Sequence, residues 1–157
     1  MENSANKTIS LLEESKIQAD VIIPILNALR KELGVERANA IVFDTLRSRL
    51  RSRYRELAAK TPGGPKEKWA VMSASMSIGS DIDIEWIDGK LETLAFNVTR
   101  CKYAELFREL GEPELGTVML CELDNHIAEA AGPEIELTRK QTLMRGAPAC
   151  EFRYRIR

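Results

Sequence analysis

Hydrophobic side chains recur every three or four residues along the first third of the chain, a spacing typical of amphipathic helices. One such stretch runs from about residue 9 to 33 and stops before Gly34, a residue type that is common directly after helices. Pro24 lies inside the stretch and predicts a kink, because proline has no amide hydrogen to donate. The predicted apolar face of this first helix consists of Ile17, Val21, Ile25 and Leu29.

A second helix is predicted from about residue 36 to 60. Its apolar side consists of Phe43, Leu46, Leu50, Tyr54 and Leu57. Residues 61–65 then contain two prolines and two glycines, which break the helical pattern. The chain therefore enters a different half at this point.

The second half begins with alternating side chains, the pattern of a β-strand with one buried face. Over residues 70–78 we expect a strand whose inward face is Ala70, Met72, Ala74, Met76 and Ile78. Alternation resumes over residues 82–99, where Asp88 and Gly89 give a strong two-residue turn signal. This segment is therefore predicted to be a β-hairpin.

Two short helices are predicted next, over about residues 101–110 and 114–130, and the chain closes with an antiparallel pair, residues 135–145 and 149–156. The fold class is α+β, with two long N-terminal helices and two short helices packed on an antiparallel sheet of about four to five strands. We expect a single domain over residues 1–157. It divides into a helical hairpin (8–61) and an antiparallel sheet (66–157) with a helical insert (101–130).

Composition excludes several classes of protein. Charged residues make up 30% of the chain, with 23 Lys and Arg against 24 Asp and Glu, so nothing favours nucleic acid as a partner. The basic run over residues 47–55 has a spacing of two, which scatters arginines around a helix and indicates a solvated face. No apolar window is long enough to cross a membrane, and no signal core begins the chain, so we expect a cytoplasmic protein. The three cysteines lack CxxC spacing and are expected to be reduced thiols.

The helix predicted over residues 114–130 places a thiol and an acid at the edge of its buried face. A helical wheel puts Leu120, Leu123 and Ile127 on the core side, and Glu122, Asn125 and Glu129 nearly opposite. His126 falls on the polar side and is expected at the surface. Cys121 and Asp124 share a stripe between the two faces.

A carboxylate at such an edge loses hydration, which raises its pKa towards the range of a general base. Asp124 is therefore a candidate base. The alternative is that it only caps a helix or bridges to a nearby arginine. Cys121 by itself is weaker evidence, because buried cysteine usually behaves as a small hydrophobic residue.

The other two cysteines lie at strand ends. Cys101 follows a strand and opens a helix, where free amides, together with Arg100 and Lys102, would stabilise a thiolate, so we expect a reactive thiol there or else a packed strand-end residue. Cys150 shares strand parity with Phe152 and faces inward. Three inward thiols and one inward acid would also suit zinc, but their spacings lack the close pairs of common zinc sites, so no metal is expected.

Five segments together resemble the L-2-amino-thiazoline-4-carboxylic acid hydrolase family. They are FNVTRCKYAELF at 96–107, GEPELG at 111–116, CELD at 121–124, TLMRG at 142–146 and CEFR at 150–153. The helical part over residues 19–34 is similar too, so the resemblance covers most of the chain. It implies hydrolysis of 2-aminothiazoline-4-carboxylate to N-carbamoyl-cysteine or, more broadly, opening of a small cyclic amidine or isothiourea at a C–N or C–S bond.

The chemistry of such a ring opening suggests roles for particular residues. Asp124 would serve as base and then acid, with Cys101 attacking directly or positioning water, and with Cys121 beside them. A small-molecule substrate is the expected partner, no cofactor is expected, and a substrate carboxylate would suit a guanidinium. The candidate substrate-binding residues are Arg100, Arg139, Tyr103, Thr142 and Cys150.

Two other classes of function fit the same layout. One is a non-catalytic small-ligand sensor domain, of the kind related to vinyl-reductase accessory proteins. The other is an oligomerisation domain in which the long N-terminal helices pair between chains to form a homo-oligomer. Asp124 separates these readings, because a desolvated carboxylate beside a thiol serves a hydrolase and has no evident use in an apolar binding pocket.

Overall fold

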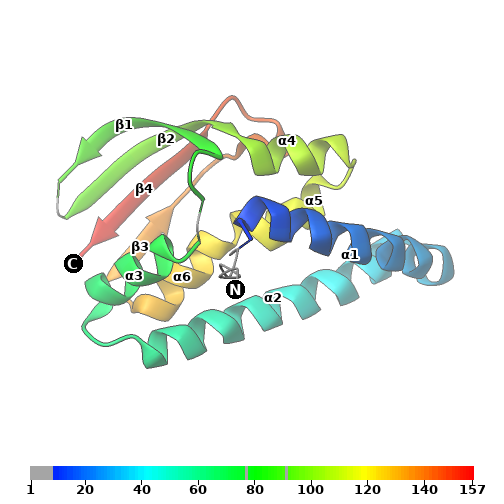
Figure 1. Ribbon diagram of the computed structural model, residues 1–157, viewed down its shortest axis with the longest axis horizontal. Coiled ribbons are helices and arrows are strands. Elements are labelled where there is room, and N and C mark those ends of the chain that lie inside the picture. Colours follow the sequence, from blue (N-terminus) through cyan, green and yellow to red (C-terminus); the bar gives the residue numbers. More distant parts are fainter. Residues whose placement is uncertain (1–8, 77, 91) are drawn as a thin grey trace, which may run out of the picture.

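The computed structural model describes residues 9–76, 78–90 and 92–157 and has the predicted α+β architecture, with two long helices leading into a helix-covered sheet (Figure 1). The start of the predicted helical hairpin at residue 8 lies outside the described residues. None of the helices described is long and apolar enough to cross a membrane. The helices are α1 Leu11–Leu33, α2 Val35–Lys60, α3 Pro65–Ala74, α4 Lys102–Glu109, α5 Pro113–Gly116 and α6 Leu123–Ala131.

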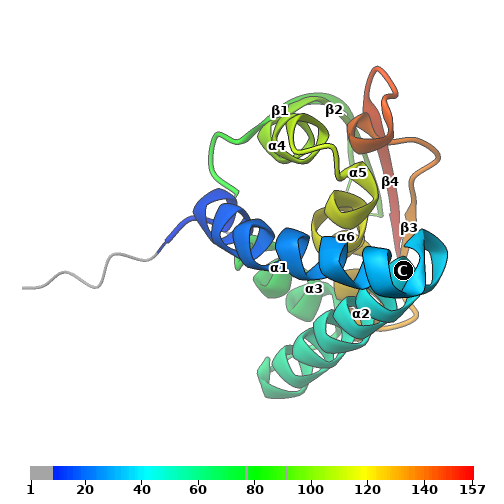
Figure 2. The same ribbon diagram turned by 90° about the vertical axis from the view of Figure 1, so that its right-hand side faces the viewer.

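Four antiparallel strands form the sheet in the order β1-β2-β4-β3. Their bounds are β1 Ile82–Gly89, β2 Thr93–Cys101, β3 Ile135–Thr138 and β4 Cys150–Ile156. Helices α4, α5 and α6 lie on one side of the sheet, and α1 and α2 form a further layer beyond α6 (Figure 2). Alternate residues of β4 are buried against these helices, as the parity of the strand requires.

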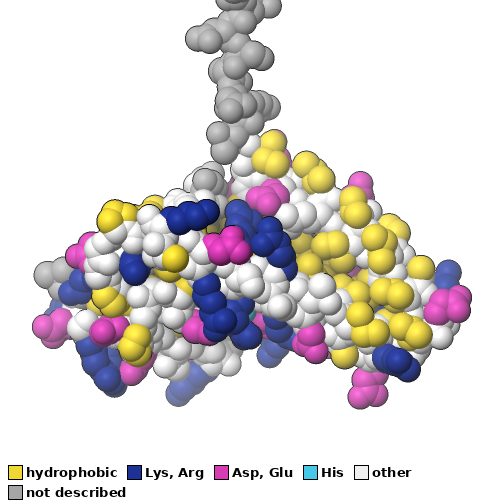
Figure 3. All heavy atoms as spheres, turned by 90° about the horizontal axis from the view of Figure 1, so that it is seen from below, with side chains coloured by type: hydrophobic (Ala, Val, Ile, Leu, Met, Phe, Trp, Pro, Cys, Tyr) yellow, Lys and Arg dark blue, Asp and Glu magenta, His cyan; other side chains and the backbone are white. Residues whose placement is uncertain are grey.

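The predicted apolar face of α1 is wrong for three of its four residues. Ile17, Val21 and Ile25 are exposed, whereas Ala19 and Leu26 are buried in the core. The helix has two apolar sides, and spacing alone does not say which one the rest of the chain covers. Figure 3 shows hydrophobic side chains gathered on one part of the surface seen from below. The helix also continues through Pro24.

The segment predicted as a strand over residues 70–78 is instead mostly helical, because α3 occupies Pro65–Ala74. Pro65 stands at the first turn, where its missing amide hydrogen costs nothing. The segment also has the spacing of one helical face, which the prediction of a strand overlooked. The residues of that face are Trp69, Met72, Ser73 and Met76. Ser77, within the predicted strand, lies outside the described residues.

The predicted hairpin over residues 82–99 is confirmed, but its turn is displaced. Asp88 and Gly89 belong to β1 and pair with Ala95 and Leu94 of β2, so the connection falls between Gly89 and Thr93. The closing pair is shorter than predicted. β3 ends at Thr138, and Leu143–Arg145 forms a 3₁₀ turn (η2) before β4.

The second of the predicted short helices contains an irregular turn. Thr117–Cys121 is a π-helical turn (η1) between α5 and α6, in which the amide of Glu122 donates to the carbonyl of Thr117 at 3.0 Å. Such a turn holds one residue more than an α-helical turn and rotates everything after it. The predicted surface position of His126 is wrong: this residue is only 5% exposed, and α2 packs against α6.

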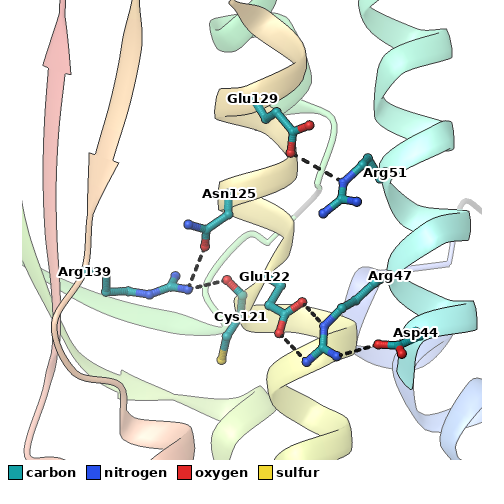
Figure 4. A network of polar contacts seen from close by, with 8 residues as sticks. All are labelled: Asp44, Arg47, Arg51, Cys121, Glu122, Asn125, Glu129 and Arg139. Atoms are coloured by element: carbon teal, nitrogen blue, oxygen red, sulfur yellow. Dashed lines mark hydrogen bonds and ion pairs between the residues drawn. The ribbon is translucent and has the colours of Figure 1, made fainter. Parts of the chain in front are cut away.

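Ion pairs join the long helices to the insert. Arg30 of α1 binds Glu112 in a bidentate pair, and Arg47 of α2 binds Glu122 with its Nε 2.8 Å from Oε2. Arg51 approaches Glu129 of α6 at 3.5 Å (Figure 4). Arg47 is half-buried, whereas the other four arginines of the basic run are exposed, so the predicted solvated face holds for most of the run.

Candidate active site

A cavity of about 300 Å³ lies between the inner face of the sheet and the segments α3, η1 and α6. Its lining contains all three cysteines of the chain, together with Asp124 and Arg139. β2 contributes Cys101, β4 contributes Cys150, and the π-helical turn contributes Cys121. The fold thus brings together chemically reactive side chains that are up to 49 positions apart, as Cys101 and Cys150 are in the numbering.

Arg139 connects the acid to the helix that carries it. Its Nη1 donates to Asp124 Oδ2 at 3.2 Å. Its Nη2 donates to the carbonyl oxygen of Cys121 and to Asn125 Oδ1, the latter at 3.3 Å (Figure 4). The guanidinium carbon also lies 4.9 Å from the ring centre of Phe152, within the range of a cation–π contact. Arg139 is therefore held on several sides, and its side chain is only 9% exposed.

Burial governs the electrostatics of Asp124. Its side chain is 20% exposed, and loss of hydration raises its pKa to about 6, although the neighbouring Arg139 opposes the shift. The sequence left two interpretations of this residue, a general base or a partner of an arginine, and the structure has features of both. Asp124 is bridged to an arginine, and it still has the raised pKa of a candidate base.

The thiols are less acidic than ordinary cysteines. Burial raises the pKa of Cys101 despite hydrogen bonds from the amides of Ala104 and Tyr103, so the predicted stabilisation of a thiolate at this helix start is outweighed. Burial raises the pKa of Cys121 to about 12 and also raises that of Cys150, whose Sγ accepts a hydrogen bond from the Leu143 amide at 3.2 Å. All three are neutral thiols at neutral pH.

The other predicted substrate-binding residues separate into two groups. Tyr103 lines the cavity, and its hydroxyl donates to Asp81 Oδ2 at 3.2 Å. Arg100 does not line it, since it lies exposed and pairs with Glu105 at 2.8 Å. Thr142 is buried outside the lining, and its carbonyl accepts the amides of the following turn.

Sequence reasoning missed the aromatic floor of the cavity and one acid, Asp81, that binds a residue of the lining. Phe96 stacks on Phe152 across β2 and β4 with ring centres 4.8 Å apart, and Trp86 of β1 continues the row at 5.1 Å. The signal was available, because these residues occupy the inward positions of strands that pair. Asp81 gave no such signal, since it lies in a loop before β1.

The zinc alternative gains no support from the side-chain positions. Within residues 9–76, 78–90 and 92–157, no group of three or more His, Cys, Asp or Glu side chains is placed to hold a metal ion. The cysteines line one cavity without converging as a tetrahedral ligand set would.

The fold and the cavity define an α+β protein with a buried acid and several thiols around one cavity. A family model described as L-2-amino-thiazoline-4-carboxylic acid hydrolase matches residues 14–154, nearly the whole chain and every cysteine discussed above. The chain belongs to this family, whose name is that of a hydrolase. A search of curated proteins found no match.

Proposed function

We propose that the protein hydrolyses a small cyclic isothiourea or amidine, with 2-aminothiazoline-4-carboxylate as the reference substrate. The observation that carries the proposal is Asp124, an acid with a pKa of about 6 that lines a cavity shared with three thiols. A general base is most effective when its pKa lies close to the working pH. The family to which the chain belongs supports the same class of reaction.

Hydrolysis requires water to attack the ring carbon that lies between sulfur and the nitrogens. Asp124 takes one proton from the water while the water oxygen bonds to that carbon. The carbon–sulfur bond then breaks, its electron pair goes to sulfur, and Asp124 passes the proton to that sulfur. The second water proton ends on the ring nitrogen, and the carbon becomes the carbonyl of a urea. With 2-aminothiazoline-4-carboxylate the product is N-carbamoyl-cysteine.

Arg139 has two roles in this proposal. It orients Asp124 and limits the rise in its pKa, so that the carboxylate remains mostly ionised at neutral pH. Its hydrogen bonds to Asp124, Cys121 and Asn125 use three of the five guanidinium N–H groups. Among the described residues, its Nε–H and one Nη1–H have no hydrogen-bond partner, and either one is a donor for a substrate carboxylate. The alternative carboxylate ligand, Arg100, does not line the cavity.

Cys101 fits the role of positioning water better than that of a free thiolate, because burial raises its pKa. Direct attack by Cys101 would require Asp124 to remove the thiol proton first, which is the pairing of nucleophile and base used in covalent catalysis. Cys121, with a pKa of about 12, stays protonated and can donate a weak hydrogen bond to the substrate.

A second function, ligand binding without reaction, is favoured by the largely apolar and aromatic lining of the cavity. Sensor domains bind small molecules in pockets of this character. Asp124 argues for the hydrolase, because burial of an ionisable acid costs stability without improving an apolar pocket.

The test is turnover of 2-aminothiazoline-4-carboxylate by the purified protein, with N-carbamoyl-cysteine identified by mass spectrometry. We expect Asp124→Asn to lower kcat by at least about 100-fold, since a positioned base contributes on that order. Cys101→Ser separates nucleophile from positioning residue, because a serine that positions water retains partial activity. Asp44→Asn is the matched control, since it removes an exposed acid that also pairs with an arginine. Unchanged turnover in Asp124→Asn would refute the assigned base, and ligand binding without any turnover would favour the sensor.

A further inference from the structure

The cavity is larger and more apolar than a bare aminothiazoline ring requires. Its volume of about 300 Å³ falls at the lower end of the range for drug-sized ligands. The reference substrate is a five-membered ring with one amino group and one carboxylate, and it would occupy only part of this space. The remaining space is bounded by hydrophobic and aromatic side chains, which offer a polar ligand group no hydrogen-bond partner.

The polar and apolar parts of the cavity lie towards opposite edges of the sheet. Arg139 follows β3, whereas Trp86 belongs to β1, at the far end of the strand order. Between them the contacts run from Arg139 to Phe152 at 4.9 Å, from Phe152 to Phe96 at 4.8 Å, and from Phe96 to Trp86 at 5.1 Å. A ligand whose ring is held at Asp124 and Arg139 would therefore reach Trp86 only through a substituent.

The far end has the geometry of a site for a flat group. Phe96 and Phe152 are nearly parallel, with 10° between their planes, while the Trp86 ring is tilted by 53° from Phe96. Such a corner offers a ring face on one side and ring edges on the other, which are the two preferred contacts of an aromatic ligand. Trp86 and Ile84 line the cavity but are 60% and 41% exposed, so a ligand there would bury apolar surface.

We propose that the substrate is a cyclic isothiourea or amidine carrying a flat apolar substituent, such as a phenyl or benzyl group, that lies against Trp86 and Phe96. This inference rests on the proposed function for the placement of the reacting ring. Trp86 is then a specificity-determining residue. The substrate is an aryl-substituted heterocyclic acid instead of unsubstituted 2-aminothiazoline-4-carboxylate.

The experiment compares 2-aminothiazoline-4-carboxylate with its 5-phenyl and 2-benzylamino derivatives, two compounds that place the aromatic group at different ring positions. Affinity is measured by calorimetry and turnover by product analysis. We expect at least one aryl derivative to bind about tenfold more tightly than the parent, the gain typical of one well-placed aromatic contact with its buried area. Its kcat/KM should rise by a similar factor.

Trp86→Ala should abolish the preference for the aryl derivative over the parent compound, while Trp86→Phe should retain part of that preference. Ile87→Ala is the matched control, because Ile87 is a neighbouring exposed residue of β1 that does not line the cavity. The inference is overturned if neither aryl derivative binds better than the parent, or if Trp86→Ala weakens all compounds equally. Tight, Trp86-dependent binding of an aryl derivative without turnover of any compound would instead support the ligand class and refute the hydrolase.

Discussion

The buried acid of the cavity makes a quantitative prediction about stability and pH. Asp124 has a pKa of about 6 in the folded protein, against an ordinary value of 3.8 for an aspartate. Between these two values the folded state binds more protons than the unfolded state, so the free energy of unfolding falls as pH rises. The difference of about two pKa units corresponds to about 3 kcal/mol.

Asp124→Asn removes the titrating group and with it this component of the pH dependence. The variant also alters the contact with Arg139, which shifts its stability at every pH, so the informative quantity is the difference curve. We expect the free energy of unfolding of the wild type, relative to the variant, to fall by about 3 kcal/mol between about pH 3.5 and pH 6.5. The assay is urea unfolding at a series of pH values, followed by the fluorescence of Trp69 and Trp86.

Asp44→Asn provides the control for this measurement. Asp44 also pairs with an arginine, at 3.3 Å from Arg47, but its side chain is 76% exposed, so it should not reproduce the change seen with Asp124→Asn. Parallel curves for the wild type and Asp124→Asn would contradict the reasoning. A difference that grows with pH would contradict it more strongly, since attraction to Arg139 would then dominate over burial.

Three further predictions concern packing, an ion pair and the thiols. Gly116→Ala places a Cβ atom 2.6 Å from the side chain of Phe107 and should cost at least about 2 kcal/mol in urea unfolding, whereas Gly89→Ala, with open space around it, should stay within about 0.5 kcal/mol. Glu112→Ala leaves Arg30 without its carboxylate partner in a mostly buried pair and should lower the free energy of unfolding by about 3 kcal/mol. Adding Arg30→Met to this variant removes the unpaired charge and should recover most of the lost stability. The cysteines should react with iodoacetamide at pH 7.5 at least about tenfold more slowly in the native protein than in urea, and equal rates would contradict the raised pKa of each thiol.

The sequence was most informative where periodicity and burial coincide. Phe43 and Tyr54 of α2 are buried as predicted, and the inward parity of Cys150 on β4 is confirmed. In both elements a single face is apolar, so the pattern specifies both the element and its orientation. The placement of Asp124 beside the cavity follows from the same logic, because its position lies next to the buried arc of α6.

Other features depend on contacts that local pattern does not contain. The pairing of Arg139 with Asp124 joins residues on different elements, and nothing in the spacing of either one selects the other among many charged residues. The exposure of Ile17 results from the absence of a covering element among the described residues, which is a tertiary property. The strand predicted at residues 70–78 was wrong because it relied on a short alternation of side chains. Pro65, just before it, is a residue type common at helix starts and indicated a helix instead.

The π-helical turn Thr117–Cys121 makes this part of the chain sensitive to length. Loss of one residue there would restore regular α-helix and rotate α6 relative to α5 by about a quarter of a turn. Asp124 would then swing away from the stripe it shares with the cavity, while the core contacts of α5 stayed in place. A one-residue gap within residues 117–121 of a related protein would thus mark a relative whose pocket no longer presents this carboxylate, even if every residue named at the site were retained.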